Sequence, residues 1–252
     1  MKKLILILLI LPWSVSLMSQ AHSFWYFSAG LAGSTTRLQG LNGVIDRYNE
    51  TRQGQAGAAT LSQEMGHFAL QSGYEFAFGR VIDDAGWFAD FHFAILEAGT
   101  YAEGQALDGS TARRDLDLVT HSLGIGVGAS IIQNSHMEVG VGGSFHFSRN
   151  RVYTRVNEEA EEMVMEDPVP ISLTPFLQAT LFLSRKIPLA AFGRGYFEVP
   201  VLATDYSPVN EKINPATYMN DEGKDFSSRN WRPGFTVGVA LILHERDRSF
   251  HQ

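Results

Sequence analysis

Residues 116–148 decide the fold of this chain, and they read LDLVTHSLGIGVGASIIQNSHMEVGVGGSFHFS. On both sides of Asn134 apolar side chains occupy every second position, and a period of two places them on one face of an extended strand. The other face carries small and polar residues, including Gly124, Gly126 and Gly128. The polar segment around Asn134 is typical of a tight turn. We therefore predict two antiparallel strands here, each with one apolar face.

The same alternation recurs along the rest of the chain. Six further segments show it, namely 23–33, 67–80, 87–99, 171–184, 189–204 and 231–244. The connections between these strands alternate strictly in length. The long ones span 34–66, 100–115, 149–170 and 205–230, and the short ones lie near 82–86, 133–135 and 186–188. Barrels of bacterial outer membranes alternate in this way, with short periplasmic turns and long extracellular loops.

These patterns predict an all-β fold, an eight-stranded antiparallel transmembrane β-barrel with up-and-down meander topology. A spanning sheet must close on itself because unpaired backbone groups cannot face lipid, and eight strands enclose a lumen that side chains just fill. The alternative is a soluble sandwich or lipocalin-like barrel, whose apolar faces point inward. The serial glycines favour the membrane barrel, since a crowded lumen selects small residues and a solvated surface does not.

The glycines also predict a register between the two central strands. A turn near Asn134 sets Gly128 near Gly140 and Gly126 near Gly142, all on the lumenal face. A strip without side chains leaves room for bulky residues from other strands. The lumenal candidates are Tyr26, Phe176, Phe182, Phe192, Arg194 and Tyr196.

The N-terminus predicts export. Residues 1–21 combine two early lysines, an apolar run from Leu4 to Leu11 and a small-residue end, as in a cleaved signal peptide. The run is too short for a membrane helix, which needs about 20 residues. We therefore expect the barrel domain to span 22–252. The chain has no cysteine and hence no disulfide, and its net charge of −7 disfavours binding to nucleic acid.

The signal segment, the eight alternating strands and the glycine-rich inner face resemble the small outer-membrane barrels of the OmpA and OmpX type, in particular the outer membrane β-barrel families of Bacteroidetes. The resemblance implies a location in the cell outer membrane and contact with its lipid and lipopolysaccharide. It also implies periplasmic chaperones and the barrel-assembly machinery as partners during biogenesis. It carries no site residues and leaves the extracellular partner unknown. One departure is that Phe250 is third from the end, whereas such barrels usually end on an aromatic residue.

Several charged and polar residues share the parity of the lumenal face. The predicted lumenal polar network consists of Glu75, Asp90, His92, Glu138, His146, Arg194, Glu198 and Arg232, with His67 and His244 added. Buried charges must pair or change their protonation. The network can therefore form either a salt-bridged plug or a selective, proton-sensitive pore. The small bore of an eight-stranded barrel favours the plug.

One short motif suggests a different function. His146-Phe147-Ser148 is similar to the His-x-Ser motif of lipid A deacylases of the PagL type, and the resemblance implies a serine nucleophile activated by the histidine. Against this, both residues have lumenal parity, and Arg149 follows where the deacylase motif has asparagine. We therefore favour a non-enzymatic barrel with structural, surface-interaction or narrow-transport roles. A deacylase-like membrane hydrolase that uses His146 and Ser148 is the alternative.

Two loop segments carry further expectations. Leu38, Leu41, Ile45 and Tyr48 recur at helical spacing and predict a short amphipathic helix on the barrel rim, as a lid or as a partner surface. Residues 158–167, EEAEEMVMED, predict a solvated acidic loop, since no regular ligand spacing supports a divalent-cation site. We accordingly expect no metal and no cofactor.

Overall fold

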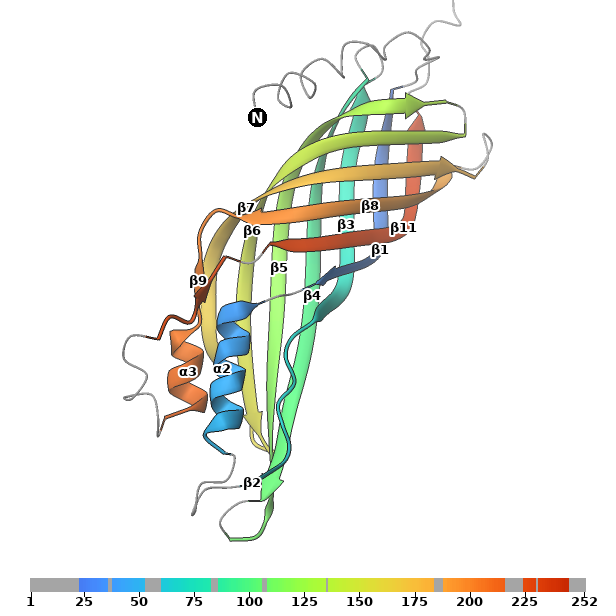
Figure 1. Cartoon of the computed structure of the whole chain (residues 1–252). Helices are drawn as coiled ribbons and strands as arrows, with labels where there is room; N and C mark the ends of the chain where they lie inside the picture. Colours follow the sequence, from blue (N-terminus) through green and yellow to red (C-terminus); the bar gives the residue numbers. More distant parts are fainter. Residues whose placement is uncertain are drawn as a thin grey trace, which may run out of the picture.

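Eight antiparallel strands close into a barrel (Figure 1). Their bounds are β1 Phe24–Thr35, β3 Leu70–Ile82, β4 Trp87–Gln105, β5 Thr111–Gln133, β6 Met137–Val156, β7 Glu162–Phe182, β8 Leu189–Pro200 and β11 Arg232–His244. They follow this order around the ring, and the pairing of β1 with β11 joins the last strand to the first. The predicted up-and-down meander is confirmed.

The computed structural model describes residues 23–35, 38–52, 60–82, 86–105, 108–134, 136–183, 188–215, 224–229 and 231–244. The predicted signal peptide lies outside the described residues. None of the described helices has the length and apolar character that crossing a membrane requires.

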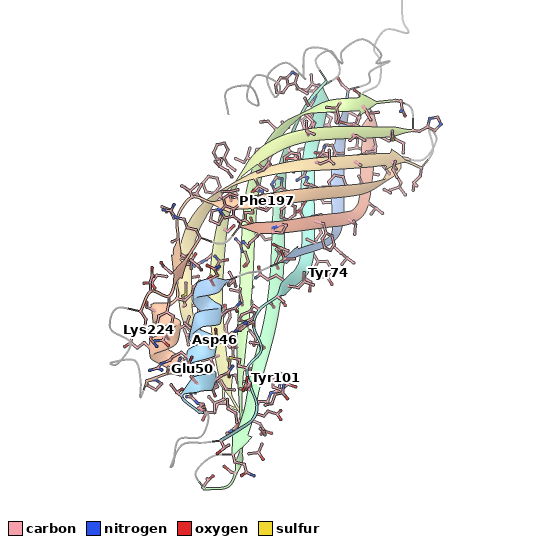
Figure 2. The ribbon with its side chains drawn as sticks, viewed as in Figure 1. Asp46, Glu50, Tyr74, Tyr101, Phe197 and Lys224 are labelled. Atoms are coloured by element: carbon pink, nitrogen blue, oxygen red, sulfur yellow. The ribbon has the colours of Figure 1, made fainter. Side chains whose placement is uncertain are left out.

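The outward face of the barrel is apolar around the whole ring. Half-exposed apolar side chains stand on all eight strands and include Phe27, Leu31, Phe76, Phe91, Ile125, Val127, Val141, Phe145, Leu177, Leu189, Val239 and Leu241. Figure 2 shows Tyr74 and Phe197 on this outer surface. An apolar surface of this extent is not stable in water, whereas a lipid-facing apolar band is the defining feature of a transmembrane barrel. The fold is therefore a transmembrane β-barrel, with the predicted side chains outward.

Four of the strands extend far beyond the other four. The adjoining ends of β3 and β4, of β5 and β6, and of β7 and β8 lie together at one end of the barrel, which we call the short-turn end. At the opposite, long-loop end, β4 to β7 continue as a curved sheet (Figure 1). We call this sheet the wall, and it comprises residues 96–105, 111–120, 149–156 and 162–167.

The wall corrects two predictions. Segments 100–115 and 149–170, which were expected to be long loops, are mostly strand. The acidic segment 158–167 likewise enters β7 at Glu162. These segments do alternate, but their outward positions carry charged residues such as Arg151, unlike the apolar outer face of the barrel strands. The inward positions are recognised as buried only when the layer that packs on them is known.

Two helices cover the inner face of the wall. We call this layer the cap, and it contains α2 Gln39–Glu50, α3 Ser207–Ile213 and the small strands β9 Thr204–Asp205 and β10 Ser227–Ser228. The short strand β2 Thr60–Gln63 pairs with β4 and extends the wall at its edge. The shared core consists of Leu38, Leu41, Val44, Ile45, Tyr48, Met65, Phe68, Ala102, Leu116, Leu118, Val152, Met165, Tyr206, Val209, Ile213 and Phe226. The predicted rim helix is α2, and its apolar face packs inside the molecule. Asp46 and Glu50 lie on its exposed side (Figure 2).

Asn134 begins the β5–β6 turn and does not lie at its centre. Its N–H donates to the Met137 carbonyl at 2.9 Å, and its Oδ1 accepts from the N–H groups of His136 at 2.8 Å and Met137 at 2.9 Å. This turn moves the pairing by three residues, and a β-bulge between Ser130 and Ile132 moves it back by one. The predicted register is therefore wrong by two residues, and Gly128 pairs with Gly142. The faces are unchanged, because a shift of two residues preserves parity.

Bulky lumenal side chains fill the space above the glycines. The ring of Phe88 lies over Gly128 and Gly140, and that of Phe176 lies over Gly142. These rings belong to a buried cluster near the short-turn end that we call the apolar plug, formed by Phe24, Tyr26, Val81, Phe88, Phe176, Ala190, Phe192, Ala240 and Ile242. Phe88 was not among the predicted lumenal residues, although its parity is that of Asp90.

The substitution Gly128→Leu should therefore destabilise the barrel by about 1 to 3 kcal/mol through overpacking. A Cβ at this position already meets the ring of Phe88 and the carbonyl of Val141. Gly195→Ala is the control, since its Cβ has no heavy atom within 4 Å. Thermal unfolding in detergent measures both, and an unchanged midpoint for Gly128→Leu contradicts the packed lumen.

Candidate functional site

Arg194 is the centre of the lumenal network. Its guanidinium forms an ion pair with Asp90, donates to Gln178 Oε1 at 2.9 Å and lies 3.7 Å from Glu75 Oε1. Its Cζ lies 4.6 Å from the centroid of the Phe176 ring. A planar guanidinium suits this position because it has five donors and also stacks on aromatic rings. One guanidinium thus neutralises carboxylates from two strands, Glu75 on β3 and Asp90 on β4.

A chain of histidines and serines continues from Asp90. His92 Nδ1 lies 3.2 Å from Asp90 Oδ1, and His92 Nε2 lies 3.0 Å from His146 Nε2. The His146 ring also contacts the hydroxyl groups of Ser122 at 3.0 Å and Ser144 at 2.8 Å. A hydrogen bond between two ring nitrogens needs one acceptor, so at least one of these rings is neutral.

The remaining predicted residues form smaller groups above and below this centre. Glu198 accepts hydrogen bonds from Ser172 and Arg232, both at 2.8 Å, toward the long-loop end. Glu138 accepts one from the Ser130 hydroxyl toward the short-turn end. All eight residues of the predicted network therefore lie on the inward face, but they form three groups, of which the one around Arg194 is the largest.

Two details differ from the sequence prediction. His67 is exposed, and its Nε2 lies 2.6 Å from Asp46 Oδ1 on α2, so it belongs to the cap and not to the lumen. The reason is that β3 begins only at Leu70, and parity does not extend before a strand starts. Tyr26, predicted only as lumenal bulk, is a polar member of the network and donates to Asp90 Oδ2 at 2.9 Å. The side chain of His244 lies outside the described residues.

The geometry that the hydrolase hypothesis requires is absent from the described residues. Ser148 faces the lumen and donates to the Ser122 hydroxyl at 3.3 Å, not to His146. His146 is held by Ser122, Ser144 and His92, and within the described chain no glutamate hydrogen-bonds to its ring. A nucleophile needs its base within hydrogen-bond reach and access to the substrate. Neither condition is met at Ser148.

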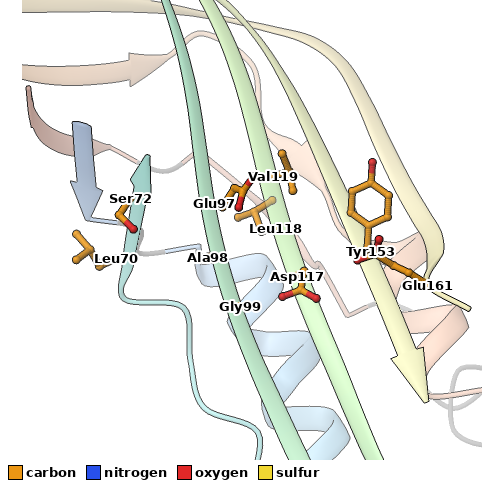
Figure 3. Close-up of a pocket in the computed structure, with 10 residues that line it drawn as sticks. All are labelled: Leu70, Ser72, Glu97, Ala98, Gly99, Asp117, Leu118, Val119, Tyr153 and Glu161. Atoms are coloured by element: carbon orange, nitrogen blue, oxygen red, sulfur yellow. The ribbon is translucent and has the colours of Figure 1, made fainter. Parts of the chain in front are cut away.

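A groove of about 630 Å³ lies on the outer face of the wall, with α2 behind the strands (Figure 3). Its lining consists of Leu70, Ser72, Glu97, Ala98, Gly99, Asp117, Leu118, Val119, Tyr153 and Glu161. Gly99 keeps it open, since a Cβ there would meet the carboxylate of Asp117. Burial raises the pKa of Asp117, and the nearby Glu161 carboxylate raises it further. Sequence reasoning missed this groove because four strands contribute to it.

Comparison with protein-family models finds no match, and comparison with curated proteins finds none either. Comparison with solved structures finds similarities at low identity. Neisserial surface protein A is 9% identical, with a TM-score of 0.43 over 86% of this chain and 96% of that one. Ail, the attachment invasion locus protein of Yersinia pestis, is 10% identical, with a TM-score of 0.43 over 89% and 100%. The outer membrane protease OmpT of Escherichia coli is 7% identical, with a TM-score of 0.38 over 91% and 100%. These similarities carry no conclusion about activity.

Proposed function

We propose that this chain is a non-enzymatic integral outer-membrane β-barrel with a filled lumen, and that it serves a structural or surface-interaction role. The observation that carries the proposal is the series of three obstructions along the barrel axis. The apolar plug occupies the short-turn end, the network around Arg194 lies behind it, and the cap covers the long-loop end.

One small cavity is described between the cap and the lumenal network. A gap of about 20 Å³ remains beside the Glu198–Arg232 pair, between Leu38 and Tyr206 of the cap. This volume holds little more than one water molecule. A transport role is therefore disfavoured. We infer that the surfaces outside the membrane carry the function of the protein.

The outer-membrane location is part of the proposal. It is supported by the apolar belt and by the signal-like segment of residues 1–21. In this orientation both ends of the barrel chain lie in the periplasm, and the wall and cap lie outside the cell. Periplasmic chaperones and the assembly machinery would deliver the chain, and outer-membrane lipid would surround the belt.

We expect no steady conductance when the purified protein is inserted into planar bilayers, because the apolar plug occupies the lumen near the short-turn end and an eight-stranded barrel has little space beside it. An open porin inserted under the same conditions is the positive control. Insertion itself is checked separately by the different gel mobility of unheated, folded protein. Reproducible unitary conductance from inserted protein would contradict the filled lumen, and complete recovery in the soluble periplasmic fraction would contradict the membrane location.

A further inference from the structure

The outer face of β6 carries a basic pair directly beyond the apolar belt. Arg149 and Arg151 follow Phe147, an exposed aromatic residue of the belt, at alternate positions on the same face. Both guanidinium groups meet the carboxylate of Glu166 through Nε, at 2.7 Å for Arg151. Two positive charges thus share one negative charge, and one positive charge is left in excess.

This basic pair is local to one side of the barrel. Across the neighbouring strands, the residues in register with Arg151 are Val119 on β5, Glu97 on β4 and Ser72 on β3. Among the described residues none of these three strands carries a lysine or arginine immediately beyond the belt. The excess positive charge therefore defines a site on β6 and not a ring around the barrel.

The same register row joins the basic pair to the groove. Ser72, Glu97 and Val119 all line the groove, and Tyr153, the next outward residue of β6 after Arg151, lines it too. The outward residues two rows below are Phe76, Phe93, Leu123 and Phe147, all of them part of the belt. The groove and the basic pair therefore form one continuous surface that starts where the belt ends.

The carboxylates of the groove differ from those around it. Glu103 and Asp115 pair with Arg113, Glu162 pairs with Lys212, and Glu166 pairs with the basic pair. By contrast, within the described part of the chain Glu97, Asp117 and Glu161 form no hydrogen bond or ion pair. These three carboxylates all line the groove.

Among the described residues no three acidic or histidine side chains are grouped so that they could hold one metal ion. Carboxylates and a tyrosine spread along a polar groove instead suit a ligand with several hydroxyl or amino groups. Arginine pairs suit phosphate, whose oxygens accept parallel hydrogen bonds. The position at the edge of the belt suits a ligand anchored in lipid.

We propose that the groove and the basic pair bind the phosphorylated saccharide headgroup of an outer-leaflet lipid, with a phosphate on Arg149 and Arg151 and the sugar against Glu97, Asp117 and Tyr153. The acyl chains then lie on the belt below. This inference rests on the proposed membrane location, which the gel-mobility assay of insertion tests separately.

The test uses the full chain folded into phosphatidylcholine vesicles that contain lipid A, a phosphorylated diglucosamine lipid. Lipid retained after extraction into mild detergent is counted by native mass spectrometry. The variants are R149Q and R151Q, singly and together, and E97Q/D117N for the groove. R113Q is the control, since Arg113 lies on β5 farther from the belt, and its partner Asp115 keeps Arg155.

We expect R149Q/R151Q to lower lipid A retention by about tenfold or more, as loss of two charge-assisted contacts implies. E97Q/D117N should lower it by roughly fivefold through loss of charged acceptors, whereas R113Q should leave it within about twofold. Equal retention by all variants overturns the proposal. Retention of phosphatidic acid as strong as that of lipid A overturns the saccharide part, and equally tight binding of water-soluble glucosamine phosphate overturns the lipid source.

Discussion

Replacing Arg194 by methionine should lower the free energy of unfolding by about 3 to 5 kcal/mol, the range for removing one partner of a buried ion pair. Methionine keeps the flexible apolar stem of the side chain but removes the guanidinium, with both its charge and its contact with the Phe176 ring. Asp90 and Glu75 are then left as buried carboxylates without their cation. Urea unfolding of the protein in lipid vesicles gives the measurement.

Two further variants separate the lost pairing from a general loss of packing. Asp90→Asn combined with Arg194→Met should cost less than the sum of the single changes, because the charge that the arginine balanced is removed as well. Arg155→Met should cost under about 1 kcal/mol, since this arginine is half-exposed on the wall. A cost below about 1 kcal/mol for Arg194→Met would show that the lumen is hydrated and that the network does not stabilise the barrel.

Replacing Val127 by arginine should destabilise the protein by about 2 to 4 kcal/mol, the cost of a charge on the lipid face near the bilayer midplane. Val127 is 57% exposed on β5, between the short-turn end and the wall. It has no lumenal route by which the new guanidinium could reach water. The same unfolding assay in vesicles measures the effect.

Met163→Arg is the matched control for this charge, because Met163 is 49% exposed on the outer face of β7 but lies in the wall. We expect a cost within about 0.5 kcal/mol there, as for other surface substitutions. Thr236→Ser, on the inward face at 2% exposure, should also cost far less than Val127→Arg. Equal effects at Val127 and Met163 would mean that lipid does not surround the belt.

The sequence alone was enough to assign the faces of the strands but not their register. Alternation is a local property, so Val127 and Val141 could be placed outward and Asp90 inward without knowing any partner strand. Register depends on where a turn begins. Asn134 caps its turn with its own side chain, and a polar segment does not reveal whether such a residue stands first or central.

The wall and cap show where sequence patterns are insufficient. Helix α2 was predictable because the spacing of its apolar residues does not depend on its partner. The strands of the wall were not predictable, since their outward positions carry charged residues. Their inward positions are buried because α2 and α3 pack on them, and this packing is a property of the tertiary structure. Helix α3 is short, and Pro208 in its first turn left little periodicity to detect.

The chemistry of the lumen was likewise determined in part by the sequence and in part by the closed ring. The sequence determined which polar residues point inward, because parity needs only the strand that carries them. Which of them pair was decided by closure of the barrel, which brings Arg194 of β8 across the lumen to Asp90 of β4, 104 residues away. The outer groove depends still more on tertiary structure, since its residues become neighbours only through the register of β3 to β6. Facing is a property of one strand, whereas a site needs the distances between strands, and those exist only in the folded sheet.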